Sequence, residues 1–81
     1  MKAFTLYVGG LPPETDSAKL AELFSEYGEL VAARVVMRPS TKTCRGFGYV
    51  TFVTGRAAAV ARAALDGHEF SGGRLRVASA T

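Results

Sequence analysis

The stretch RGFGYVTF, residues 45–52, constrains the fold most, because it predicts a strand with aromatic rings on both of its faces. Successive side chains of a strand point to opposite sides. Phe47 and Tyr49 therefore share one face, whereas Phe52 lies on the other. A small chain cannot bury both faces of such a strand, so the rings on one face need a different explanation.

The chain has 81 residues, which leaves no room for a second core, and we expect residues 1–81 to form a single domain. The net stability of such a domain is about 5 to 10 kcal/mol. Its formal net charge of +3 is compatible with a polyanionic partner. Arg34, Arg38, Lys42 and Arg45 follow one another with no acidic residue between them. We therefore expect one basic end.

Cys44 is the only cysteine, which excludes an internal disulfide and argues against a metal cluster. A reducing, intracellular compartment is the natural interpretation, without a choice between cytoplasm and nucleus. We expect Cys44 to be a partly exposed loop residue without function. No apolar run is long enough to span a membrane, and the apolar stretch 3–11 is needed as a strand rather than as a cleaved signal peptide.

Alternating apolar residues predict strands in 4–10, 30–38 and 45–53, and a turn followed by a last strand within 68–80. An apolar stripe at helical spacing predicts a first helix that Asp16 caps and Gly28 ends. An alanine-rich second helix should run from a Thr54 cap to Gly67. The order is therefore strand, helix, strand, strand, helix, strand.

This order predicts an α+β fold, a ferredoxin-like βαββαβ sandwich in which two helices cover one face of a four-stranded antiparallel sheet. The residues expected on the covered face are apolar: Leu6, Val8, Ala33, Val35, Val50, Phe52, Leu75 and Val77. Tyr7, Phe47 and Tyr49 then face outward, with Arg34, Arg74 and Arg76. Burying a large side chain is worth about 1.5 to 3 kcal/mol, so a ligand should cover these rings.

Flat rings flanked by arginines suit nucleobases, which stack on the rings while their phosphates meet the positive charge. Stacking one base on an aromatic side chain is worth about 1 to 3 kcal/mol, the same order as the burial that the exposed rings forgo. We therefore expect a single-stranded nucleic acid as the partner. No residue shows whether a 2′-hydroxyl is recognised, so RNA and DNA are both candidates.

LYVGGL, residues 6–11, and RGFGYVTF resemble the two signature strands of the RNA recognition motif family. The resemblance covers essentially the whole chain and implies that the partner is single-stranded RNA. It implies that Tyr7 and Tyr49 each stack on a base, that Phe47 packs against the ribose between two nucleotides, and that Arg45 pairs with a phosphate. It leaves the roles of Arg34, Arg74 and Arg76 open among base edges, sugars and phosphates.

The loop before residue 45 departs from the usual family pattern. Arg38 stands where many members carry Asp, and Lys42 stands where they carry a mid-loop glycine. The turn geometry should therefore differ. The loop also becomes more basic, so Lys42 should favour phosphate contacts, although a solvated charged loop is the simpler alternative.

Two other function classes are compatible with a chain of this fold and size. A protein-interaction or dimerisation module of the same fold would use its helices, and Ala57, Val60 and Ala64 could form a mild apolar strip there. Members that work this way typically lose the aromatic residues that are present here, so we expect a monomer or a weak homodimer. An enzyme would need a catalytic group, and no paired carboxylates, nucleophile or phosphate loop stand out. We expect no enzyme, cofactor or metal.

Overall fold

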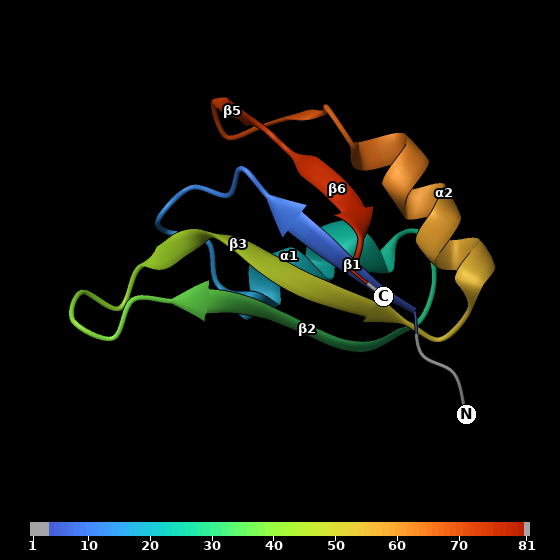
Figure 1. Ribbon diagram of the computed structural model, residues 1–81, viewed down its shortest axis with the longest axis horizontal. Helices are drawn as coiled ribbons and strands as arrows, with labels where there is room; N and C mark the ends of the chain where they lie inside the picture. Colours follow the sequence, from blue (N-terminus) through green and yellow to red (C-terminus); the bar gives the residue numbers. More distant parts are fainter. Residues whose placement is uncertain (1–3, 81) are drawn as a thin grey trace.

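The structure, a computed structural model, describes residues 4–80 (Figure 1). The ends of the predicted domain, residues 1–3 and 81, lie outside the described residues. The elements follow in the order β1 (Phe4–Gly9), α1 (Ser17–Ser25), β2 (Leu30–Met37), β3 (Cys44–Phe52), α2 (Gly55–Leu65), β4 (Glu69–Phe70), β5 (Gly73–Arg74) and β6 (Arg76–Ser79).

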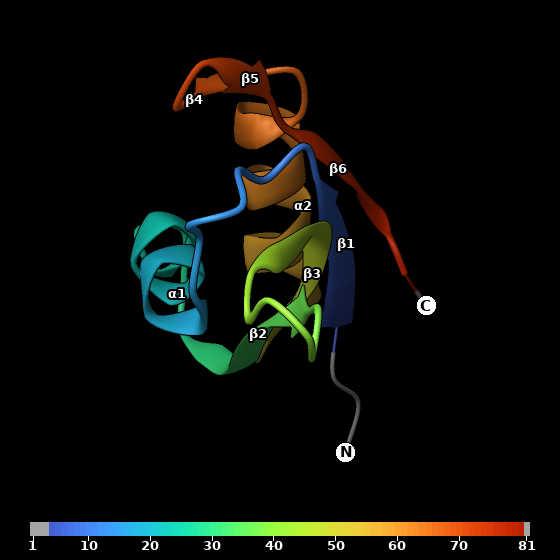
Figure 2. The same ribbon diagram turned by 90° about the vertical axis from the view of Figure 1, so that its left-hand side faces the viewer.

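Four strands form one antiparallel sheet in the order β2-β3-β1-β6. Residue 7 of β1 lies opposite residue 49 of β3, so the two glycine- and aromatic-rich strands are neighbours in the middle of the sheet. Both helices lie on the same side of this sheet (Figure 2). The predicted α+β, ferredoxin-like arrangement is confirmed.

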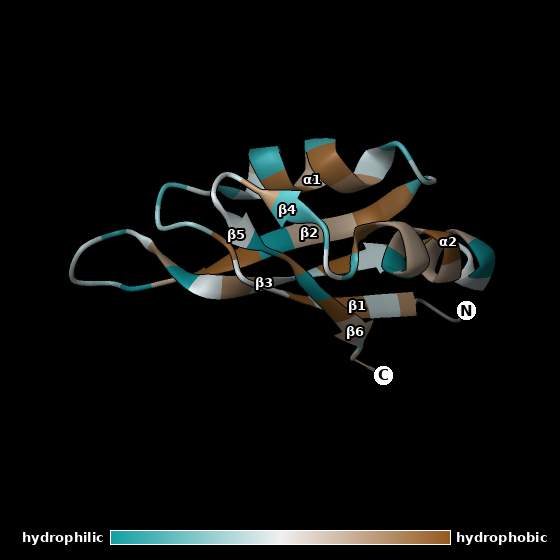
Figure 3. Cartoon of the chain, turned by 90° about the horizontal axis from the view of Figure 1, so that it is seen from above, coloured by the Kyte–Doolittle hydropathy of each residue, from teal (hydrophilic) through white to brown (hydrophobic). Residues whose placement is uncertain are grey.

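The core lies between the sheet and the helices, and the predicted inward set fills it. All of that set is buried except Ala33, which is half-buried. Phe24 of α1 packs against Phe52 of β3, with ring centroids 6.3 Å apart. In Figure 3 apolar segments, drawn in brown, run along the strands, and α1 carries both hydrophilic and hydrophobic turns.

Both predicted N-caps are confirmed. Asp16 Oδ1 accepts the Lys19 N–H at 2.8 Å, and Thr54 Oγ1 accepts the Ala57 N–H at 3.1 Å. Helix α1 ends at Ser25, earlier than predicted, because the Tyr27 and Gly28 N–H groups bond three residues back and tighten the turn. Gly28 has a φ of +157°, and a Cβ there would collide with the Cβ of Ala57 on α2.

The prediction of one last strand carrying both arginines is wrong. Residues 69–74 form a separate hairpin, β4 and β5, and only Arg76–Ser79 joins the sheet beside β1. Ser71 and Gly72 make the hairpin turn with φ values of +50° and +85°. Arg74 therefore lies off the sheet, where its Nη1 donates to the Gly67 carbonyl at 3.2 Å.

Cys44 is buried, which corrects the prediction of a partly exposed loop residue. It begins β3 because it pairs with Met37, extending the hairpin by one residue. Its N–H donates to the Pro13 carbonyl at 2.9 Å, and its Sγ accepts the Gly46 N–H at 3.3 Å. The loop before α1 therefore covers this end of the sheet.

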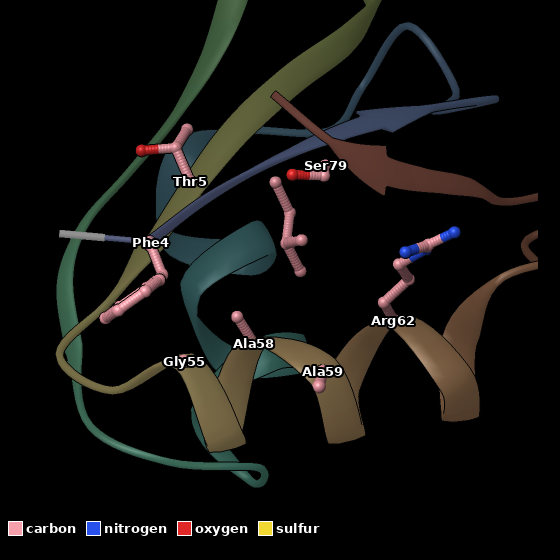
Figure 4. A pocket seen from close by; sticks show the side chains of 8 residues that line it. Phe4, Thr5, Gly55, Ala58, Ala59, Arg62 and Ser79 are labelled. Atoms are coloured by element: carbon pink, nitrogen blue, oxygen red, sulfur yellow. The ribbon is translucent and has the colours of Figure 1, made fainter. Parts of the chain in front are cut away.

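Helix α2 faces the sheet with Ala57, Ala58, Ala61 and Leu65. Ala57 is thus a core residue, and the outer apolar strip predicted for Ala57, Val60 and Ala64 does not form. Arg62 stays exposed and extends from α2 toward β6 at the rim of a shallow pocket of about 180 Å³ (Figure 4). Small residues on the inner side of α2 let the helix approach the sheet closely.

Candidate nucleic-acid interface

Three aromatic rings form a cluster on the face of the sheet opposite the helices. The Tyr7 ring centroid lies 5.9 Å from that of Phe47 and 6.1 Å from that of Tyr49. The Phe47 and Tyr49 centroids are 6.2 Å apart, and their planes are nearly perpendicular at 89°. All three side chains are partly exposed. Within residues 4–80 the helices lie on the other side, so this face, here called the open face, presents the rings to solvent.

Strand register explains why these rings meet. Tyr7 pairs with Tyr49, and Phe47 pairs with Gly9, so the rings occupy neighbouring positions on adjacent strands. A Cβ at Gly9 would lie 2.7 Å from the Tyr7 hydroxyl oxygen, which shows that the Tyr7 ring lies along the strand over Gly9. This role of Gly9 was not predicted from the sequence. It could have been predicted from strand alternation, because Gly9 follows Tyr7 by two residues and therefore lies on the same face of β1.

Two arginines flank the cluster on the outer strands. Arg34 of β2 pairs with Tyr49, and its Cζ lies 5.8 Å from the centre of the Tyr49 ring, within the range of a cation–π contact. Arg76 of β6 is exposed and pairs with Gly9, which in turn pairs with Phe47 on its other side. The open face therefore has a positive charge on each side of the rings.

The other predicted cations lie at the ends of strands. Arg45, the second residue of β3, is exposed at the end of the sheet nearest Phe47. Lys42 is exposed in the β2–β3 loop and has a φ of +57°, a left-handed conformation that glycine favours. The Lys42 N–H donates to the Arg38 carbonyl, and the Arg38 N–H donates to the Thr43 carbonyl, each at 2.7 Å. These bonds close the loop and hold its cations at one end.

The structure thus brings most of the predicted site residues to one face or to its rim: Tyr7, Phe47, Tyr49, Arg34, Arg45 and Arg76, with Lys42 on the adjoining loop. Arg74 is the exception, because it belongs to β5 and bonds to Gly67.

The open face also carries a polar pair that was not predicted from the sequence. The hydroxyl oxygens of Thr5 and Thr51 are 2.9 Å apart across β1 and β3. They line a hollow of about 390 Å³ together with Arg34, Tyr49 and Ala80. The two threonines are 46 positions apart in the chain, so only the strand register shows that they meet.

Residues 4–80 contain no group of three or more His, Cys, Asp or Glu side chains placed to hold a metal ion. None of the helices in that range has the length and apolar character needed to cross a membrane.

Comparisons with known proteins agree with this geometry. A family model described as the RNA recognition motif matches residues 6–76. The chain is 47% identical over 75 residues to the chloroplastic RNA-binding protein CP31B of Arabidopsis thaliana. The aligned region covers 93% of this chain and 26% of that relative. It is 40% identical over 77 residues to the mitochondrial glycine-rich RNA-binding protein 3 of the same plant. That alignment covers 95% of this chain and 25% of the relative. The chain thus spans about a quarter of the length of these curated relatives.

Solved structures show the same arrangement. The RNA recognition domains 1 and 2 of Sex-lethal from Drosophila melanogaster match with a TM-score of 0.91 and 26% identity, covering 96% of this chain and 50% of that one. The RNA-binding protein PG1 matches with a TM-score of 0.89 and 34% identity, covering 95% of this chain and 93% of that one.

Proposed function

Because the chain belongs to the RNA recognition motif family, we propose that it binds single-stranded RNA on the open face of its sheet. The observation that carries the proposal is the cluster of Tyr7, Phe47 and Tyr49, whose centroids are 5.9 to 6.2 Å apart on the face opposite the two helices. Relatives that are named RNA-binding proteins support it.

The three rings make two kinds of contact in this proposal. Tyr7 and Tyr49 stack on successive bases, and Phe47 packs against the ribose between them. Stacking contributes about 1 to 3 kcal/mol per base, so two stacked bases supply much of a modest affinity. A sheet of this width holds about two to four nucleotides.

The cations at the rim supply the electrostatic part of binding. Arg45 and Lys42 meet phosphates at one end of the sheet, and Arg34 and Arg76 reach bases, sugars or phosphates from the two outer strands. Arg74 contributes only from the β4–β5 hairpin, after releasing the Gly67 carbonyl. Three or four phosphate contacts predict a slope of about −2 to −3 in log K against log salt, at about −0.7 per contact for single strands.

The proposal extends to the remaining properties of the chain. We propose a binding domain rather than an enzyme, formed by residues 1–81 and working as a monomer or a weak homodimer inside the cell. The intact aromatic cluster favours RNA binding over a module dedicated to protein interaction. The chloroplast and mitochondrial names of relatives support an intracellular location. Single-stranded DNA of the same sequence should bind more weakly wherever a 2′-hydroxyl is contacted.

Fluorescence anisotropy with short labelled RNAs tests the proposal. Tyr7→Ala should weaken binding by about five- to a hundredfold, the equivalent of one stacking contact, and Phe47→Ala should weaken binding because the ribose loses the ring against which it packs. Val60→Ala, on the exposed side of α2, is the control and should leave the affinity unchanged. Circular dichroism checks that each variant folds. Unchanged affinity in both folded ring variants would refute binding on the open face.

A further inference from the structure

The hollow beside the aromatic cluster is lined by the polar side chains of Thr5, Thr51 and Arg34, which base stacking does not use. It has a volume of about 390 Å³, ample for one nucleobase. Thr5 and Thr51 pair across β1 and β3, one pair along from Tyr7 and Tyr49 on the same face. In Figure 4 Thr5 points away from α2, whereas Phe4 beside it points toward Gly55 of that helix. The hollow therefore continues the open face past Tyr49.

The two threonines offer a defined hydrogen-bonding capacity. One hydroxyl hydrogen is used between their oxygens, which are 2.9 Å apart. The pair keeps a second hydroxyl hydrogen and several lone pairs, so it can accept an N–H from a ligand. Because the bond between the threonines restrains both hydroxyls, these lone pairs are held in place before a ligand arrives.

Arg34 adds donors of a different kind. Its guanidinium is a planar fork of N–H donors without an acceptor, and it lines the same hollow. It lies 5.8 Å from the centre of the Tyr49 ring, so it is beside any base that enters. A fork of this kind selects two neighbouring acceptor atoms on one edge of a base.

Guanine has the matching run of atoms along its edge: the acceptors N7 and O6, followed by the donor N1–H. Adenine places an amino donor next to N7, and the acceptors of uracil are separated by an N–H. Cytosine has two adjacent acceptors, O2 and N3, with an amino donor beside N3, so it is the competing base. Arginine paired with O6 and N7 of guanine is the commonest specific contact between a side chain and a base.

We propose that the hollow lined by Thr5, Thr51 and Arg34 is a guanine subsite, an inference that rests on the proposed binding of single-stranded RNA. Arg34 donates to O6 and N7, and a threonine hydroxyl oxygen accepts N1–H. The flanking base stacks on Tyr49. The chain therefore binds RNA with a guanine at one fixed position in preference to RNA without one.

Anisotropy titrations with octamers that differ at one nucleotide test the proposal. In a uridine background, a central guanine should bind about tenfold more tightly than uracil, adenine or cytosine. Inosine lacks only the 2-amino group and should keep the gain. 7-Deazaguanine lacks the N7 acceptor and should lose most of it.

Two protein variants test whether the Arg34 guanidinium and the Thr51 hydroxyl produce the preference for guanine. Arg34→Lys keeps the charge but removes the fork, and Thr51→Val keeps the shape but removes a hydroxyl. Each should abolish the preference for guanine, measured within each variant as the ratio of its affinity for the guanine octamer to its affinity for octauridine, because one base contact is lost and the rings remain. Arg76→Lys, on the opposite outer strand, is the matched control and should keep the preference.

The outcomes separate this proposal from the one on which it rests. Failure to bind any octamer would overturn RNA binding and the guanine subsite together. Binding that is equal for all four bases, or that favours cytosine with its adjacent N3 and O2, would overturn the subsite alone. A guanine preference that survives both Arg34→Lys and Thr51→Val would also overturn it.

Discussion

Replacing Lys42 by glycine should raise stability and weaken RNA binding at the same time. Lys42 has a φ of +57°, in a region where an L-residue brings its Cβ close to the next carbonyl. Its side chain is exposed, so removing it opens no cavity. Strained backbone conformations persist most often where a side chain has a functional role, and the role proposed for this one is a phosphate contact.

The left-handed conformation costs an L-residue about 1 to 2 kcal/mol. Glycine removes that cost but makes the unfolded chain more flexible, which lowers the stability of the folded state by about 0.5 to 1 kcal/mol. The difference predicts that Lys42→Gly raises the free energy of unfolding by about 0.5 kcal/mol. For a domain of this size the expected rise in Tm is about 2 to 4 °C, measurable by thermal denaturation followed by circular dichroism.

RNA binding should change in the opposite direction. Losing one phosphate contact should make the salt slope shallower by about 0.7 and weaken binding at low salt in anisotropy titrations. Ser71 is the matched control, because it is the other non-glycine residue with positive φ among residues 4–80, at +50°, and it lies in the β4–β5 turn. Ser71→Gly should raise Tm similarly and leave the salt slope unchanged. A Lys42→Gly variant with lower Tm, or with unchanged affinity and slope, would refute the reasoning.

Three further predictions concern single contacts. Gly9→Ala should displace the Tyr7 ring, because the new Cβ would lie 2.7 Å from the Tyr7 hydroxyl oxygen; shifted Tyr7 NMR signals and several-fold weaker RNA binding would show it, and unchanged signals would contradict it. Asp66→Ala removes the carboxylate oxygen that accepts the Val77 N–H at 3.0 Å, and should lower stability by about 1 kcal/mol, seen as a Tm lower by about 4 to 8 °C; an equal Tm would exclude this role. The buried Cys44 thiol should react slowly with an aromatic disulfide reagent until guanidinium unfolds the chain; rapid reaction in the folded state would count against its burial.

Short-range patterns predicted the central part of this fold. Alternation along residues 4–9 and 45–52 placed Tyr7, Phe47 and Tyr49 on the face away from the core, because strand periodicity is a property of each strand by itself. The caps at Asp16 and Thr54 were predictable for a similar reason, since each involves a side chain and a backbone N–H three residues later.

The features that the sequence did not predict depend on distant contacts or on very short elements. The strands of the β4–β5 hairpin have two residues each, too few for alternation, so Arg74 was placed on the sheet by extrapolation. Burial of Cys44 follows from its bond to Pro13, 31 positions earlier by residue number. The Thr5–Thr51 pair needs the register of β1 on β3, which no local pattern specifies.

The central claim is that RNA lies on the open face of the sheet, and an NMR titration with a short single-stranded RNA measures this most directly. With the aromatic side chains and the backbone labelled, the largest shift changes should fall on Tyr7, Phe47 and Tyr49, while the outer side of α2, including Val60, stays unchanged. Shift changes concentrated on the helices, with the three rings unaffected, would contradict the account.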